Sequence, residues 1–267
     1  HIHDRRQRQM CIRDRSLFYL AIHAKTVIHA GYLFDADTAS LEPEMTIVIE
    51  ENIISDVVAG YISPESDDLY IDLTGYYILP GLIDMHVHLT SQSSSKAYIE
   101  RTTLNSADYA IRATKNAEKT LLAGFTSVRN LGDADSITIS LRNAINNGVT
   151  FGPRIFSSGT TISTTGGHGD PTNSLNLTLT SDPGPREGVI NGKEDAYKAV
   201  RHRYKQDADL IKITATGGVL SNAKNGQNPQ MTVDEIKAIV ASAKDYGFKV
   251  AAHAHGSEGI KRATLAG

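Results

Sequence analysis

Two histidine pairs with the same spacing are present in the sequence. His86 and His88 occur in "LIDMHVHL", and His253 and His255 occur in "VAAHAHG". Both segments are predicted strands, and alternate residues of a strand share one face. Each pair can hold a metal ion between neutral imidazoles, or it can be two independent, hydrogen-bonded histidines. Two such pairs on separate strands favour the metal site. Asp84 has the same parity as His86, so we expect it on the same face, deeper in the strand.

Lys212 lies inside another predicted strand, "DLIKITATGG". Ile211 and Ile213 would face covering helices, so the lysine would face the interior. A buried ammonium is costly, and burial lowers its pKa. Lys212 could pair with a carboxylate such as Asp84, or act as a neutral amine that forms a Schiff base. It could also take up carbon dioxide as a carbamate that bridges two metal ions, and the nearby histidine pairs favour this third outcome.

His168 follows two glycines in "TTGGHGD", within a predicted loop from Thr160 to about Gly188. It is either a solvated loop histidine or a contact to substrate or transition state, since glycines let the backbone approach a ligand closely. Arg129, Asn130 and Asp133, near the end of the second strand, are weaker candidates. An arginine at a strand end is more often part of a structural ion pair.

A strand–helix alternation positions these residues. The predicted strands are 82–89, 126–132, 154–159, 209–218 and 249–256. The predicted helices are 109–123, 136–147, 193–204 and 257–266, and a further helix begins at Thr232, which forms a capping box with Glu235. Such repeats form parallel strands with helical crossovers, and active sites lie at the carboxyl ends of those strands. The fold class is therefore α/β, as a doubly wound sheet or a (β/α)8 barrel. Only five of a barrel's eight units fit, so a barrel implies a chain that is cut short.

The N-terminal third lacks the strand–helix alternation of the rest of the chain. Residues 25–77 alternate in the manner of β-strands and predict a small β-rich unit. Residues 1–15 are densely charged and resemble a sequencing remnant. Residues 16–24 are apolar and are either the tail of a signal peptide or an irregular N-terminus, which favours a periplasmic or secreted protein slightly over a cytoplasmic one. The one cysteine, Cys11, falls in the remnant, so a metal site would use histidine or carboxylate ligands.

The composition limits the classes of binding partner that we expect. The net charge is −3, and no long basic run occurs, so we expect neither nucleic acid nor an anionic membrane surface as a partner. No apolar run reaches the roughly 18 residues of a membrane span. The expected partner is a small-molecule or dipeptide substrate. The formation of a homo-oligomer is an open hypothesis.

Four motifs together resemble a known family. "LPGLIDMHVHL" resembles the first-strand signature of the amidohydrolase superfamily. "TTGGHGD", "LIKITATGGVLS" and "VAAHAHG", in this order, are similar to its Xaa-Pro dipeptidase branch, whose members are often labelled imidazolonepropionase-related. The resemblance covers residues 25–267. It implies a TIM-like, distorted (β/α)8 metal-dependent hydrolase barrel, residues 78–267, beside a small N-terminal β-sandwich part.

The resemblance also implies a binuclear site, usually with two zinc ions. Its ligands here would be His86, His88, Lys212 as a carbamate formed with CO2, and His253. His255 falls where the branch often has Tyr or His near the substrate carboxylate. The family further uses a histidine on the sixth strand and an aspartate on the eighth, and the sequence stops before either. We therefore expect a fragment that is inactive as written.

The expected reaction is attack of a metal-activated water on a peptide or amide bond, with a C-terminal dipeptide as the first-choice substrate. His168 and His255 would contact the oxyanion or the substrate carboxylate. Three alternatives stay open. The first is hydrolysis of a cyclic amide, as in imidazolonepropionases. The second is a metal-free lyase that uses Lys212 as a Schiff base, and the third is a non-catalytic binding domain.

Overall fold

The computed structural model describes residues 24–219 and 225–267, and the chain divides after Pro80 into two compact units. The expectations for residues 1–15 and, apart from Ala24, for residues 16–24 lie outside the described residues. Among residues 24–219 and 225–267, none of the helices has the length and the apolar character of a membrane span.

The N-terminal unit contains a four-stranded sheet in the order β3-β2-β1-β4. β1 and β2 pair antiparallel, as do β2 and β3, while β4 runs parallel to β1. The strands are β1 (Thr26–Asp35), β2 (Ser40–Glu50), β3 (Ile53–Ala59) and β4 (Leu69–Ile78). The described part of this unit forms one sheet, so the second layer of a sandwich stays a prediction.

Five parallel strands form the framework of the second unit: β5 (Leu82–Val87), β6 (Phe125–Asn130), β7 (Arg154–Ser157), β10 (Ile211–Thr214) and β11 (Val250–His253). β5, β6 and β7 make one sheet, and β10 pairs with β11. A parallel bridge between Ile162 and Ile213, and a 2.8 Å hydrogen bond from Asp209 N to Ser157 O, connect the two groups. The carboxyl ends of all five strands therefore meet at a common edge.

The long loop predicted from Thr160 contains more structure than expected. The short strands β8 (Ser163–Thr164) and β9 (Val189–Ile190) pair in parallel, with a 3-10 turn at Leu177–Leu179 between them. Of the two strands, only β8 lies within the predicted loop, because β9 begins directly after its predicted end at about Gly188. A two-residue strand is too short to show periodicity in the sequence, so β8 was not predicted.

Six α-helices occur in the described part of this unit: α1 (Ala97–Thr103), α2 (Ser106–Leu122), α3 (Ile137–Asn146), α4 (Lys193–Lys205), α5 (Val233–Asp245) and α6 (Ser257–Ala266). α1 was not predicted, because it buries no residue and so has no apolar stripe. α2 begins before the predicted Tyr109, since Asn105 and Asp108 form a capping box. The predicted box between Thr232 and Glu235 is confirmed.

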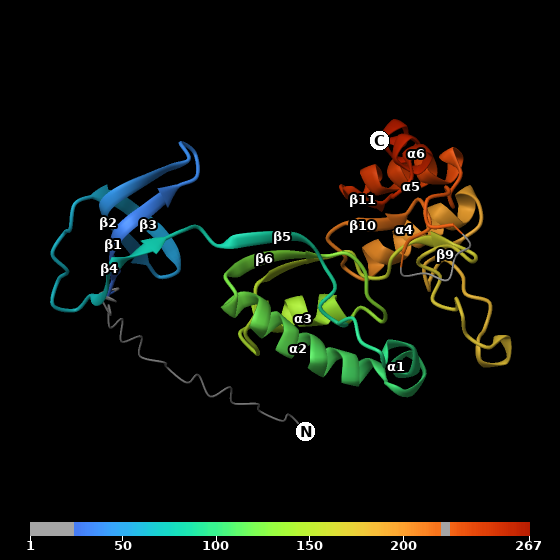
Figure 1. Ribbon diagram of the computed structural model, residues 1–267, viewed down its shortest axis with the longest axis horizontal. Helices are drawn as coiled ribbons and strands as arrows, with labels where there is room; N and C mark the ends of the chain where they lie inside the picture. The colour runs from blue at the N-terminus through green and yellow to red at the C-terminus, as the bar shows by residue number, and fades with distance from the viewer. Residues whose placement is uncertain (1–23, 220–224) are drawn as a thin grey trace, which may run out of the picture. The chain divides into compact units, whose positions relative to one another are not determined.

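Two apolar clusters join the helices to the strands. Figure 1 shows the ribbon of these helices and strands. Val128 and Ile155 pack against Ala117 of α2 and Leu141 of α3. In the second cluster, side chains of α4 and α5 pack on β10, where Ile211 and Ile213 are at most 1% exposed. This confirms the expected orientation of the two isoleucines, and it leaves Lys212 on the opposite face of the strand.

A register shift in β5 corrects the expectation for Asp84. Asp84 pairs with Val128, whereas Val87 pairs with Asn130, so β5 contains one extra residue between them. The extra residue reverses the alternation. Asp84 therefore lies on the helix-covered face with Val128, and His86 and His88 lie on the other face. The Asp84 carboxylate accepts a hydrogen bond from the His86 backbone N–H at 2.9 Å.

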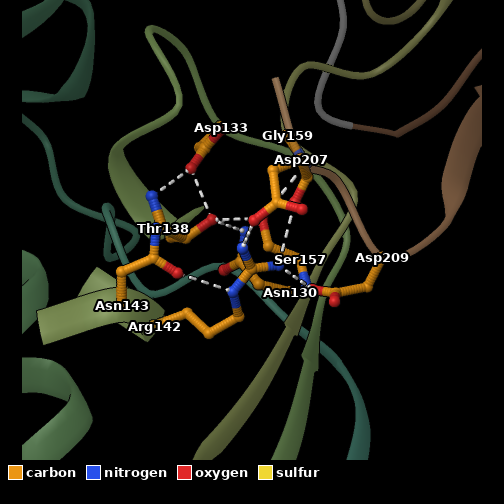
Figure 2. Close-up of polar contacts among 9 residues, drawn as sticks. All are labelled: Asn130, Asp133, Thr138, Arg142, Asn143, Ser157, Gly159, Asp207 and Asp209. Carbon is orange, nitrogen blue, oxygen red and sulfur yellow. Dashed lines mark hydrogen bonds and ion pairs between the residues drawn. The ribbon is translucent and has the colours of Figure 1, made fainter. Parts of the chain in front are cut away.

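A polar network ties α3 to the strand ends (Figure 2). Arg142, whose side chain is 9% exposed, donates to Asp209 Oδ2 at 2.7 Å and to Asp207 Oδ2 at 2.5 Å. Asp209 Oδ2 also accepts from the backbone N–H of Ser157, at 2.7 Å, at the end of β7. Thr138 of α3 bonds Ser157 Oγ at 2.7 Å. The Asp209 carboxylate thus connects α3, the end of β7 and the segment that leads into β10.

Removal of Asp209 should destabilise this unit strongly. Asp209→Ala leaves Arg142 with only the exposed Asp207 as a carboxylate partner and removes the acceptor of the Ser157 N–H, and we expect a loss of about 1.5–3 kcal/mol in the free energy of unfolding. Asp207→Ala is the matched control, because the Asp207 side chain is 81% exposed and such pairs contribute less than about 1 kcal/mol. Urea denaturation of the three proteins measures both values, and equal losses would contradict the role of Asp209.

Candidate active site

Lys212 is buried, with 4% of its surface exposed. Its strand is held in place on one side by a 2.8 Å hydrogen bond from Ile162 N to Lys212 O. Within residues 24–219 and 225–267, no carboxylate forms an ion pair with its amine, so the pairing with Asp84 is not observed. Burial, and then the positive charge of Arg129, lowers the pKa of Lys212 to about 8. At pH 7 about a tenth of the amine is therefore neutral, far more than for an ordinary lysine.

His86 and His88 present their rings side by side beyond the register shift, with centroids 5.3 Å apart. Burial, and then the charge of Lys212, lowers the pKa of His86 to about 4. Burial also lowers the pKa of His88. His88 Nδ1 lies 3.2 Å from Gly132 O. A neutral ring that donates its Nδ1–H to that carbonyl presents the Nε2 lone pair to the site, as metal-binding histidines do.

His253 lies beside Lys212 because of the strand register. It pairs with Thr214, which shares a face with Lys212. His253 Nε2 lies 2.9 Å from Gly217 O, so a neutral ring that donates there leaves its Nδ1 lone pair available. Burial lowers the pKa of His253, although the hydrogen bond to Gly217 opposes the shift. His253 and Lys212, which the sequence predicts as ligands of one metal site, thus lie on the same face of neighbouring strands.

His168 and His255 both adjoin His253. The ring centroids lie 4.3 Å apart for His168 and His253, and 4.7 Å apart for His253 and His255. Burial, and then the charge of His253, lowers the pKa of His168 to about 4. The ring packs so closely on Gly218 that a Cβ there would lie 2.4 Å from its Cε1. His168 is therefore part of this site and is not a solvated loop residue.

Gln230 holds the His168 loop, and no sequence pattern predicts this role. Gln230 Oε1 accepts from His168 N at 2.8 Å, and its backbone O accepts from Thr164 Oγ1 at 2.9 Å. Gln230 belongs to the segment before α5, 62 residues further along the chain. A contact between two irregular segments has no periodicity, so only the tertiary structure reveals it.

The three weaker candidates have structural contacts. Arg129 Nε donates to Met85 O at 2.8 Å and forms no ion pair within the described ranges. Asn130 is fully buried, and its side chain accepts from Leu89 N and donates to Thr138. Asp133 Oδ2 accepts from the backbone and the hydroxyl of Thr138.

The donor set fits a metal centre only in part. Among the described residues, no three or more His, Cys, Asp or Glu side chains are grouped so that they could hold a metal ion. The histidines nevertheless present unprotonated nitrogens at His88 and His253, which suit a zinc-like ion. No carboxylate of the described residues joins them. A two-metal centre would need an added anionic ligand, and a carbamate on Lys212 would be one.

Comparisons with known proteins agree with this geometry. Residues 77–267 match the amidohydrolase family. The chain is 30% identical over 262 residues to ochratoxinase of Aspergillus niger, an alignment that covers 91% of this chain and 52% of that protein. These matches confirm the resemblance inferred from the four motifs.

Two solved structures are also similar. One is a Xaa-Pro dipeptidase with bound methionine in the active site, at 52% identity and a TM-score of 0.88, over 91% of this chain and 60% of that one. The other is a prolidase complexed with N-methylphosphonate-L-proline, at 34% identity and a TM-score of 0.82, over 91% of this chain and 59% of that one. This chain therefore spans between about half and three fifths of the length of these relatives.

The lowered pKa of Lys212 predicts a specific pH dependence of stability. Between pH 8 and 10.5 the unfolded lysine binds more protons than the folded one, so the free energy of unfolding rises with pH in this window. Lys212→Met lacks the titrating amine and keeps an unbranched side chain. We expect the wild type to gain stability relative to this variant between pH 8 and 10, measured by urea denaturation in CO2-free buffer with a chelator. Parallel pH profiles would contradict a buried amine without a partner.

Proposed function

The chain belongs to the amidohydrolase family, and on that basis we propose that its site hydrolyses a peptide or amide bond in a small substrate, with a C-terminal dipeptide as first choice. One observation carries the proposal. The Lys212 amine is buried without a carboxylate and lies among histidines whose rings are neutral at neutral pH. The dipeptidase and prolidase among the similar structures support the choice of a dipeptide.

We propose His86, His88, Lys212 and His253 as the ligands of two divalent metal ions, with zinc as the first choice. Amidohydrolases generally use divalent metals, and the free lone pairs of His88 and His253 support the assignment. The neutral Lys212 amine would bond to the carbon of CO2 and release one proton to water, which gives a carbamate with two oxygen donors. When bound, the metal ions would lower the pKa of a water molecule and polarise the scissile carbonyl.

The remaining histidines would act on the substrate. His168 is fixed at its backbone by Gln230 and at its ring by Gly218 and His253. A neutral His168 can donate one ring N–H to the oxyanion that develops on the scissile carbonyl. His255 follows the end of β11, and its backbone N–H donates to Thr216 Oγ1 at 3.0 Å. We propose it as a second contact to the oxyanion or to the substrate carboxylate.

The fold of the whole domain is also a proposal. Part of the inner face of the strands is apolar and open, with Ile83 63%, Met85 53% and Phe156 47% exposed around a cavity of about 570 Å³. A (β/α)8 barrel would cover this face, and it needs three more strand–helix units than the five that the described residues form. In the N-terminal unit, the apolar side chains around Met45 and Ile47 line a cavity of about 370 Å³, which the second sheet of a sandwich would fill.

A Schiff-base lyase is the second candidate, because the same unpaired amine of Lys212 could attack a carbonyl substrate. Reduction with borohydride in the presence of such a substrate would then add mass at Lys212. Hydrolysis of a cyclic amide, as in imidazolonepropionases, would use the proposed site with a different substrate. The histidines on β5 and β11 favour the metal hydrolase, since a Schiff base assigns them no role.

The test uses protein expressed from the whole natural reading frame that contains this sequence. We expect hydrolysis of L-alanyl-L-proline that a chelator abolishes. His168→Gln should lower kcat about 10²–10³-fold, because it weakens an oxyanion contact, and should change KM little. Circular dichroism checks that the variant is folded. If no dipeptide of a panel is hydrolysed and borohydride traps a carbonyl substrate at Lys212, the lyase would replace the hydrolase as the proposed function.

A further inference from the structure

One buried hydroxyl lies where the ladder of hydrogen bonds between β10 and β11 ends. The last backbone bond there runs from Ala215 N to His253 O at 2.9 Å. Two residues further on, the N–H of His255 donates to Thr216 Oγ1 at 3.0 Å. Thr216 is fully buried. The acceptors of a parallel ladder are backbone carbonyls, so a side chain here continues the ladder by one bond.

The same hydroxyl is connected to the His253 ring through one carbonyl. Thr216 Oγ1 donates to Gly217 O at 2.8 Å, and His253 Nε2 lies 2.9 Å from the same oxygen. A hydroxyl carries one proton and two lone pairs, so it can donate to Gly217 while it accepts from His255. A carbonyl oxygen can likewise accept two hydrogen bonds. The hydroxyl can therefore hold the Gly217 carbonyl while that carbonyl accepts the ring N–H.

Loss of the hydroxyl would release one restraint on the Gly217 carbonyl. This carbonyl belongs to the peptide between Gly217 and Gly218, and glycine has the widest backbone freedom of all residues. A side chain could not restrict that freedom, because a Cβ on Gly217 would lie 2.4 Å from Asn225 O. The Thr216 hydroxyl thus restrains a peptide that its own two residues restrain little.

The methyl group of Thr216 has a separate, structural contact. A Cβ on Gly259 of α6 would lie 2.1 Å from Thr216 Cγ2, so the helix approaches the methyl through a residue without a side chain. Figure 1 shows α6 beside β10 and β11. Because χ1 of a β-branched residue is stiff, the packed methyl also fixes the direction of the hydroxyl. Substitution can separate the two groups, since valine keeps the shape and serine keeps the hydroxyl.

We propose that Thr216 is a positioning residue for the two histidines at the end of β11. Its hydroxyl holds the Gly217 carbonyl where it receives the His253 Nε2–H, which leaves the Nδ1 lone pair available to a metal ion. It also anchors the backbone of His255. The inference rests on the proposed metal hydrolysis, in which His253 is a metal ligand and His255 a substrate contact. Thr216 acts only through these partners.

The experiment compares Thr216→Val and Thr216→Ser with the wild type, in protein from the whole natural reading frame. Competition with a chromophoric chelator measures the affinity for zinc. In the metal-free protein, 15N NMR of the histidine rings reports which nitrogen of His253 carries the proton, and His253→Gln assigns the signals. Thr114→Val is the matched control, because it removes a hydroxyl that donates to Ala110 O at 3.0 Å within α2.

Thr216→Val should weaken zinc binding about tenfold, as expected when a hydrogen-bond partner behind a metal ligand is lost. In the metal-free protein it should shift or broaden the His253 nitrogen signals, which in the wild type should show the proton on Nε2. Thr216→Ser should bind zinc within about twofold of the wild type and keep its His253 signals, although loss of the methyl lowers its thermal stability. The Thr114 control should change neither measurement. A purely structural role would instead make the zinc affinity follow the thermal stability across the variants.

Several results would overturn the proposal. One is a Thr216→Val protein with the zinc affinity and the His253 signals of the wild type. Another is an equal loss in Thr216→Ser or in Thr114→Val. If Thr216→Val does not fold, Thr216→Ala takes its place, because alanine and serine at this position differ only in the hydroxyl. A wild type that binds no zinc would contradict the proposed metal site, and the His253 signals of the same proteins would still decide the role of Thr216.

Discussion

The alternation of side chains along β10 is the constraint on which the candidate site depends. Burial of Ile211 and Ile213 under α4 and α5 contributes about 1.5–3 kcal/mol for each side chain. These two residues fix the face of the strand, and Lys212 must then point the other way. Because β10 pairs with β11 on one side and bonds Ile162 on the other, it cannot rotate to expose the amine. Partial loss of the proton, with a pKa of about 8, reduces the cost of this burial.

The parallel strands bring the other groups to the amine. Their carboxyl ends share one edge, so His86 and His88, at and just after the end of β5, lie at the same edge as His253 of β11 although they are far apart in sequence. Two backbone carbonyls, Gly132 O and Gly217 O, then orient the rings of His88 and His253. The carbonyls belong to the loops that follow the neighbouring strands. The same framework that aligns the strands therefore also orients the nitrogens that would bind metal.

Periodic features could be predicted from the sequence, and irregular ones could not. The five strands, the inward orientation of Lys212 and the proximity of His253 follow from alternation and from parallel topology. The extra residue in β5 has no compositional signature, so Asp84 was placed on the wrong face. The register shift lies between Asp84 and Val87, and the rings of His86 and His88 still lie side by side, with centroids 5.3 Å apart. The contact of Gln230 joins two irregular segments, and that of Arg101 with Pro171 joins α1 to an irregular segment, so only tertiary structure reveals them.

The most direct test of the central claim is the metal content per chain, measured by elemental analysis on protein from the whole natural reading frame, with Lys212→Ala beside it. A carbamate that bridges a two-metal centre predicts about two zinc-like ions in the wild type and a sharp fall in the variant. One ion that the substitution does not change would contradict the bridging role of Lys212. A well-folded protein without metal would contradict the metal hydrolase altogether.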